Sequence, residues 1–111
     1  MLGLTTLWSK AQDSLIEDSI RWMNTGDSLR TEAYLFADEP ISGACSQDCY
    51  DIDLTLYDAT TKKSVAEEHK NTKTPTVYAP YEGDFILNVE MVNCARSGGC
   101  RTWINYDNEE F

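Results

Sequence analysis

The stretch CSQDCYDIDLTLYD, residues 45–58, joins a short cysteine loop to the clearest strand pattern in the chain. In its second half, apolar residues take every other position and polar residues lie between them: Ile52, Leu54 and Leu56 alternate with Asp51, Asp53 and Thr55. A period of two is typical of a β-strand with one buried face. The stretch therefore predicts a strand over residues 51–58 whose apolar side chains face a core.

Strand-like runs bounded by turn signals recur on both sides of this stretch. They cover residues 19–23, 29–36, 75–78, 85–92 and 101–106, and residues 63–70 form a polar segment that is an edge strand or irregular. About seven or eight short strands with frequent turns predict an all-β protein, an antiparallel β-sandwich of jelly-roll type. We expect the first two runs to form a hairpin around Asn24-Thr25-Gly26-Asp27, and residues 41–44 to be a connection.

The first segment has a different period. Leu4, Leu7, Trp8, Ala11 and Leu15 recur at helical spacing. This pattern predicts a short amphipathic helix within residues 1–17, packed on a β-sandwich domain over residues 18–111. Trp8 and Trp22 are assigned to packing this helix on the sheet, and the alternative is a helix that binds a partner.

The four cysteines fall in two short loops, Cys45 to Cys49 and Cys94 to Cys100. Four cysteines allow three pairings, of which two local bonds and a cross-link between the loops are the serious ones. A zinc site is the competing interpretation, but the one histidine, His69, is isolated among charged residues. Disulfides indicate an oxidising compartment, so we expect a secreted, periplasmic or cell-surface protein. Residues 1–8 lack a basic n-region, so export implies that a signal peptide has been removed.

Composition and charge exclude several classes of partner. The 111 residues carry nine basic and nineteen acidic side chains, a net charge of −10. That charge repels phosphate backbones and anionic lipid surfaces, so we expect no nucleic acid partner. No run is long enough to span a bilayer, so we expect no membrane insertion.

Three motifs resemble the bacterial pre-peptidase C-terminal domain, a secreted β-sandwich, here in a form with paired cysteines. They cover Gly43 to Asp58, Thr74 to Gly83 and Val89 to Cys100, in the order of that family. The resemblance implies an export-associated, jelly-roll-like sandwich that accompanies secreted hydrolases without itself catalysing a reaction. Together with the local spacing, it favours the pairs Cys45–Cys49 and Cys94–Cys100.

An acidic cluster is the first candidate site. In an extended strand Asp51 and Asp53 point to the same face, and Asp48 and Asp58 flank them. Hard oxygen ligands in a loop-and-strand setting suit calcium, the one cofactor the sequence indicates. The alternative is a solvated outer face on which carboxylates cap turns and discourage edge pairing.

Aromatic side chains are the second candidate. Tyr57, Tyr78, Tyr81 and Trp103 are predicted as ligand-binding residues, because exposed rings on a sandwich can stack on sugars or dock peptides. The alternative is that these rings complete the core or its rim.

Catalysis has little support. A hydrolytic triad would need His69 beside a serine such as Ser64, and oxidised cysteines offer no thiolate. The sequence therefore predicts a non-catalytic, exported binding or accessory module for an unknown protein, glycan or cell-surface ligand. The alternatives are a structural subunit that forms homo-oligomers and a calcium-stabilised adhesion domain appended to a secreted hydrolase.

Overall fold

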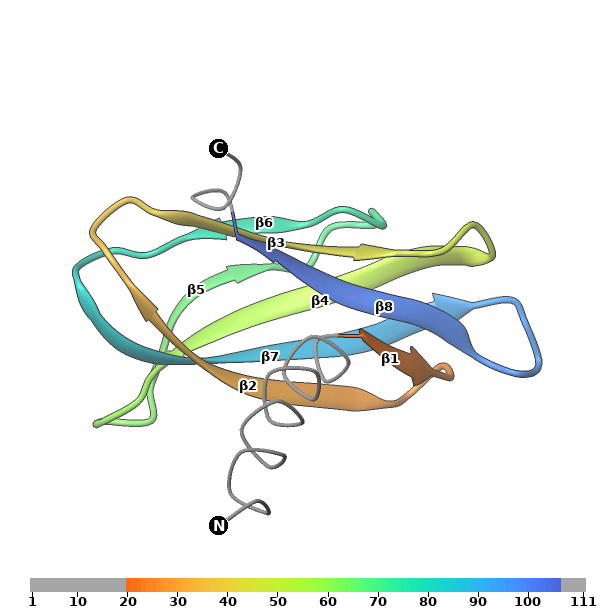
Figure 1. Ribbon diagram of the computed structural model, residues 1–111, viewed down its shortest axis with the longest axis horizontal. Helices are drawn as coiled ribbons and strands as arrows, with labels where there is room; N and C mark the ends of the chain where they lie inside the picture. The colour runs from red at the N-terminus through yellow and green to blue at the C-terminus, as the bar shows by residue number, and fades with distance from the viewer. Residues whose placement is uncertain (1–19, 107–111) are drawn as a thin grey trace, which may run out of the picture.

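The computed structural model describes residues 20–106, which form two four-stranded antiparallel sheets (Figure 1). One sheet has the strand order β1-β8-β3-β6 and the other the order β2-β7-β4-β5. The strands are β1 (Ile20–Met23), β2 (Ser28–Leu35), β3 (Pro40–Cys45), β4 (Cys49–Asp58), β5 (Ser64–Glu68), β6 (Thr76–Tyr78), β7 (Gly83–Cys94) and β8 (Cys100–Tyr106). The prediction of an all-β sandwich is confirmed, whereas the predicted helix within residues 1–17 lies outside the described residues.

The core lies between the sheets and is built from alternate residues of the long central strands. On β4 and β7 the fully buried side chains, besides Cys49, are Ile52, Leu54, Leu56, Phe85, Leu87, Val89 and Met91. Leu54 lies opposite Val89 and Leu56 lies opposite Leu87, so the two apolar rows face the same interior. Burying each such side chain stabilises the fold by about 1.5–3 kcal/mol. The predicted inward faces of these two strands are confirmed.

The predicted hairpin between the first two strands is wrong. Strand β1 pairs with β8, with Ile20 opposite Trp103, whereas β2 pairs with β7 in the other sheet. The turn itself forms, since the Asn24 amide donates to the Asp27 carboxylate at 2.8 Å and Gly26 has a φ of 98°. Turn residues fix a local change of direction, but this turn carries the chain from one sheet to the other.

Residues 40–45 form a strand where a connection was predicted. Pro40 stands at the first position of β3, where a missing N–H is tolerated, and Ile41, Gly43 and Cys45 are buried. A Cβ on Gly43 would lie 3.0 Å from Cδ1 of Ile52. Glycine therefore lets β3 pack closely on the opposing sheet, and its low strand propensity hid this strand in the sequence.

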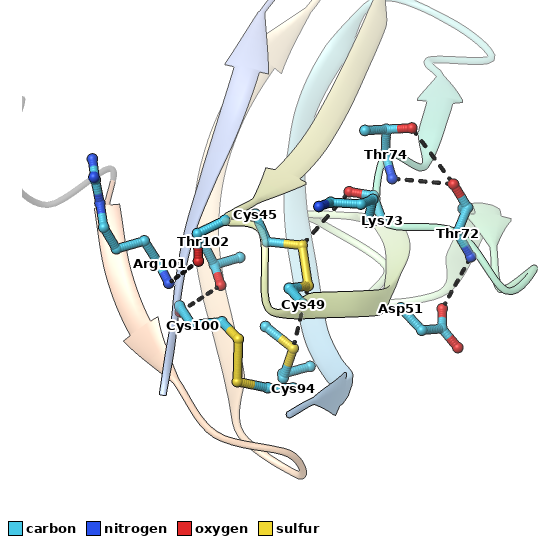
Figure 2. The surroundings of a disulfide bond; sticks show 12 residues. Cys45, Cys49, Asp51, Thr72, Lys73, Thr74, Cys94, Cys100, Arg101 and Thr102 are labelled. Atoms are coloured by element: carbon cyan, nitrogen blue, oxygen red, sulfur yellow. Dashed lines mark hydrogen bonds between the residues drawn. A yellow bond between two sulfur atoms is a disulfide. The ribbon is translucent and has the colours of Figure 1, made fainter. Parts of the chain in front are cut away.

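Both disulfides join the two sheets at one end of the sandwich. Cys45 on β3 is bonded to Cys49 on β4, and Cys94 on β7 is bonded to Cys100 on β8. Cys49 and Cys94 lie opposite each other in the β4–β7 register, so the two bonds are neighbours (Figure 2). The local pairing is the one that forms, and residues 20–106 contain no free cysteine.

Candidate binding surface

Charged residues are divided unequally between the strands of the two sheets. Strands β1, β8, β3 and β6 contain Arg21 and Arg101 and no acidic residue. The strands of the other sheet contain one arginine and eight acidic residues: Arg30 against Glu32, Asp51, Asp53, Asp58, Glu67, Glu68, Asp84 and Glu90. The sheet that contains β8 is therefore locally basic within an acidic protein.

The outer surface of this basic sheet carries three large aromatic side chains, and we call it the aromatic face. Met23 and Thr102 are buried, so their neighbours Trp22 and Trp103 point outward. Trp22 is 56% exposed and Tyr78, on the edge strand β6, is 59% exposed. Exposed aromatic rings gathered on one sheet face are typical of surfaces that bind a ligand or a partner.

The register fixes how these rings are spaced. Trp22 lies opposite Arg101, two residues before Trp103, so the two tryptophans are diagonal neighbours about 7–8 Å apart. Tyr78 lies two strands from Trp103 and four residues further along β3, a separation of about 16 Å at ordinary strand spacing. The three rings thus lie along one diagonal across the sheet.

Two guanidinium groups stack on the tryptophans. The Cζ atom of Arg96 lies 5.6 Å from the centre of the Trp22 ring, and that of Arg101 lies 5.9 Å from the centre of the Trp103 ring. Both distances are those of cation–π contacts. Within residues 20–106 neither guanidinium forms an ion pair or donates a hydrogen bond. Their N–H groups are consequently not engaged by any other described residue.

The disulfide loop positions both arginines. Arg96 lies within the loop closed by Cys94 and Cys100, and Arg101 follows it directly. The Gly99 amide donates to the Arg96 carbonyl at 3.0 Å, and the Arg101 amide donates to Oγ of Ser46 at 3.1 Å. In Figure 2 the Arg101 side chain points away from both disulfides. The covalent loop therefore limits how far the two guanidinium groups can move apart.

The structure separates the four aromatic residues predicted to bind a ligand. Trp103 and Tyr78 lie on the aromatic face, whereas Tyr57 lies on the opposite sheet with Arg30 stacked 5.4 Å from its ring centre. Tyr81 lies just before β7, with its ring 5.4 Å from that of Phe85. These four residues do not form one platform.

The structure likewise does not assemble the predicted calcium ligands. Among residues 20–106, no group of three or more His, Cys, Asp or Glu side chains is close enough to share a metal ion. The Asp51 carboxylate accepts a hydrogen bond from the Thr72 amide at 3.3 Å. Asp58 lies at the far end of β4, and Asp48 lies in the cysteine loop. The four carboxylates are therefore spread along β4 and its two ends.

Asp58 is occupied in shaping a turn. Its carboxylate accepts hydrogen bonds from the amides of Thr60 and Thr61 at 2.8 and 2.9 Å and from the Tyr81 hydroxyl at 2.5 Å. The Tyr81 hydrogen bond, followed by these amides, lowers the pKa of Asp58. The same contact raises the pKa of Tyr81. This carboxylate acts as a turn cap, one of the alternatives raised from the sequence.

Asp53 has a different environment on the outer face of β4. Its Oδ1 atom is buried without a hydrogen-bond partner among the described residues. Burial is the main cause that raises the pKa of Asp53; nearby His69 lowers it, and Asp51, Glu90 and Glu68 raise it further. Beside it Thr55, which alternation places on the polar face of the strand, is 9% exposed and hydrogen-bonded to Nε2 of His69 at 2.9 Å.

The candidate catalytic pair is not brought together. Ser64 begins β5 and His69 follows its last residue, so the two lie at opposite ends of that strand. His69 contacts Thr55 and, at 3.8 Å, the Glu67 carboxylate. Two open hollows, of about 550 and 440 Å³, lie along β2 and β7, and neither is lined by His69.

The sequence missed Trp22, Arg96 and Arg101 as site residues. Trp22 was predicted to pack the helix within residues 1–17 on the sheet, a contact that lies outside the described residues, and more than half of Trp22 is exposed. Arg101 and Trp103 are two positions apart on one strand, and this spacing could have predicted from the sequence that their side chains share a face. The contact between Arg96 and Trp22 depends on the pairing of β1 with β8, which no local pattern reveals.

In comparisons with known proteins, the sequence matches no family model and no curated protein. The resemblance to the pre-peptidase C-terminal domain therefore stays a prediction. Within residues 20–106, no helix has the length and apolar character needed to cross a membrane.

Proposed function

We propose that this protein is a non-catalytic binding module of an oxidising, extracytoplasmic compartment, and that the aromatic face is its binding surface. The observation that supports the proposal most directly is the cluster of Trp22 and Trp103 with Arg96 and Arg101 stacked on them. Tryptophan and arginine are the residues most enriched at energetically dominant positions of binding surfaces. A jelly-roll-like sandwich of the pre-peptidase C-terminal type is part of the same proposal.

The two disulfides support the compartment. Bonds of this kind persist in secreted, periplasmic and cell-surface proteins and are rare where thiols are kept reduced. They also stabilise the end of the sandwich that carries the arginines, and a rigid surface loses less entropy when it binds.

The test is a binding screen of the folded protein against an array of neutral and acidic glycans and a displayed random peptide library. Wild type is compared with Trp22→Ala and with Tyr50→Ala, because Tyr50 is similarly exposed, at 54%, but lies on the other sheet. We expect Trp22→Ala to lose the wild-type ligands and Tyr50→Ala to keep them. Recovery of the same ligands by all three proteins, or of none by wild type, would refute the proposal.

A further inference from the structure

The chemistry of the two stacked arginines narrows the class of ligand. A guanidinium in cation–π contact with an indole ring uses its charge there, while its N–H donors can still bind a second group. Those donors form a fork that matches a carboxylate or another planar oxyanion in bidentate geometry. Arg96 and Arg101 lie over their tryptophan rings at cation–π distance, and neither has an acidic partner among the described residues. The aromatic face thus presents two unpaired sites for anionic groups.

We infer that the ligand of the aromatic face is a polysaccharide that carries carboxylates, such as a polyuronate. This inference rests on the proposed function. Arg96 and Arg101 pair with carboxylates of the chain. The exposed rings of Trp22 and Tyr78, together with the partly buried ring of Trp103, contact the apolar C–H faces of its sugars.

The surface between the rings fits a sugar chain better than a peptide or a nucleic acid. On the path from Trp103 to Tyr78 the outward positions are neutral and polar: Asn105, Ser42 and Thr76. Oγ of Ser42 and Oγ1 of Thr76 lie 2.8 Å apart and offer hydroxyl groups. Sugar hydroxyls are matched by such donors and acceptors, whereas an extended peptide is bound mainly by unpaired backbone at a sheet edge. A nucleic acid would need more than two cationic contacts for useful affinity.

The net charge of −10 does not prevent local anion binding. Packed sheets are about 10 Å apart, and outward side chains add to that separation. The Debye length at physiological ionic strength is about 8 Å, so the acidic strands on the other side are largely screened from the aromatic face. The strands of this sheet hold no acidic residue, and the acidic residue that contacts the loop of Arg96 is Asp48, whose carbonyl accepts a hydrogen bond from the Ala95 amide at 2.9 Å.

The experiment compares three probes by calorimetry in EDTA: polygalacturonate, its fully methyl-esterified form and poly-L-glutamate. Methyl esterification keeps the sugar backbone and removes the carboxylate charge. We expect polygalacturonate to bind, with an affinity that falls as sodium chloride is raised. We expect the ester and poly-L-glutamate to bind at least tenfold more weakly.

Variants assign this binding to the two arginines. Arg96→Gln and Arg101→Gln should each weaken polygalacturonate binding about tenfold, the effect of losing one charge-assisted hydrogen bond at an exposed site. Arg30→Gln is the matched control, because Arg30 also lies over an aromatic ring, that of Tyr57, but on the opposite sheet, where it donates to Asn88. It removes one positive charge and should leave the affinity unchanged.

The outcomes separate this inference from the proposed function. Suppose that polygalacturonate and its ester bind equally well and that Trp22→Ala loses this binding. That result would support the aromatic face as the binding surface and overturn the role of the carboxylates. Stronger binding of poly-L-glutamate would overturn the glycan assignment in favour of an acidic peptide. Absence of polygalacturonate binding, or equal loss in Arg30→Gln, would overturn the inference, while the screen with Trp22→Ala still decides the proposed function.

Discussion

Removing the disulfides should destabilise the sandwich by an amount that follows from the size of the loops they close. Cys45 and Cys49 are four positions apart, and Cys94 and Cys100 are six apart, so the closed loops contain five and seven residues. The loop-entropy relation then gives about 2.1 kcal/mol for the first bond and about 2.3 kcal/mol for the second. The loops do not overlap in sequence, so their entropic effects on the unfolded chain should add to roughly 4.4 kcal/mol.

The assay is urea unfolding of wild type and of alanine variants of each cysteine pair and of both pairs. Because Cys49 and Cys100 are fully buried, alanine also removes packed sulfur atoms. Reduced wild-type protein keeps the sulfur atoms and loses only the covalent bonds. The difference in unfolding free energy between reduced wild type and the alanine variants therefore measures the contribution of sulfur packing. A loss near zero for both pairs would refute the entropic reasoning. A loss well above 5 kcal/mol for one pair would show that the bond acts mainly in the folded state.

Three further predictions concern packing and titration. Gly43→Ala should cost about 1–3 kcal/mol in urea unfolding because its Cβ meets the opposing sheet, whereas Gly98→Ala, with open space around its Cβ, should cost less than about 0.5 kcal/mol; equal effects would contradict the packing. Asp53→Asn should raise the melting temperature at pH 7 and not at pH 3. The raised pKa of Asp53 means that the folded protein loses stability as the pH rises and this carboxyl group ionises, and a decrease at pH 7 would contradict the buried environment of Asp53. Tyr81→Phe should lower the melting temperature at pH 7 more than at pH 2. The lowered pKa of Asp58 stabilises the fold only while that carboxylate is ionised, so a pH-independent change would assign the effect of the substitution to packing alone.

Local alternation predicted the parts of the fold in which one strand carries its own signal. Leu54 and Leu87 are buried as expected, because a period of two fixes which side chains share a face whatever strand lies alongside. The same pattern could not show that Thr55 is covered by His69, since that contact depends on the segment that follows β5. Side chains on an outer face are exposed or buried according to neighbours that alternation does not specify.

The local sequence pattern could not predict which distant strands pair with each other. The candidate site depends on that pairing. The turn residues 24–27 suggested a hairpin, because the same residue types form turns within one sheet and turns that connect two sheets. Only the pairing of β1 with β8 places Trp22 beside Arg101. Trp103 and Tyr78 could be named as candidates one by one, but their common face is a property of the assembled sheet.

The positions of the disulfides also set the order in which the protein opens. They tie β3 to β4 and β7 to β8, which are the two central strands of each sheet, while β1, β2, β5 and β6 are edge strands held by one neighbour each. Edge strands can therefore detach without breaking the cross-linked centre, and amide hydrogen exchange should be slowest in the four central strands. Strand β1 has only four residues and carries Trp22, so its fraying would transiently dismantle the aromatic face. Ligand binding should accordingly slow exchange in β1 more than in the centre, which links affinity to the cost of keeping a short edge strand in place.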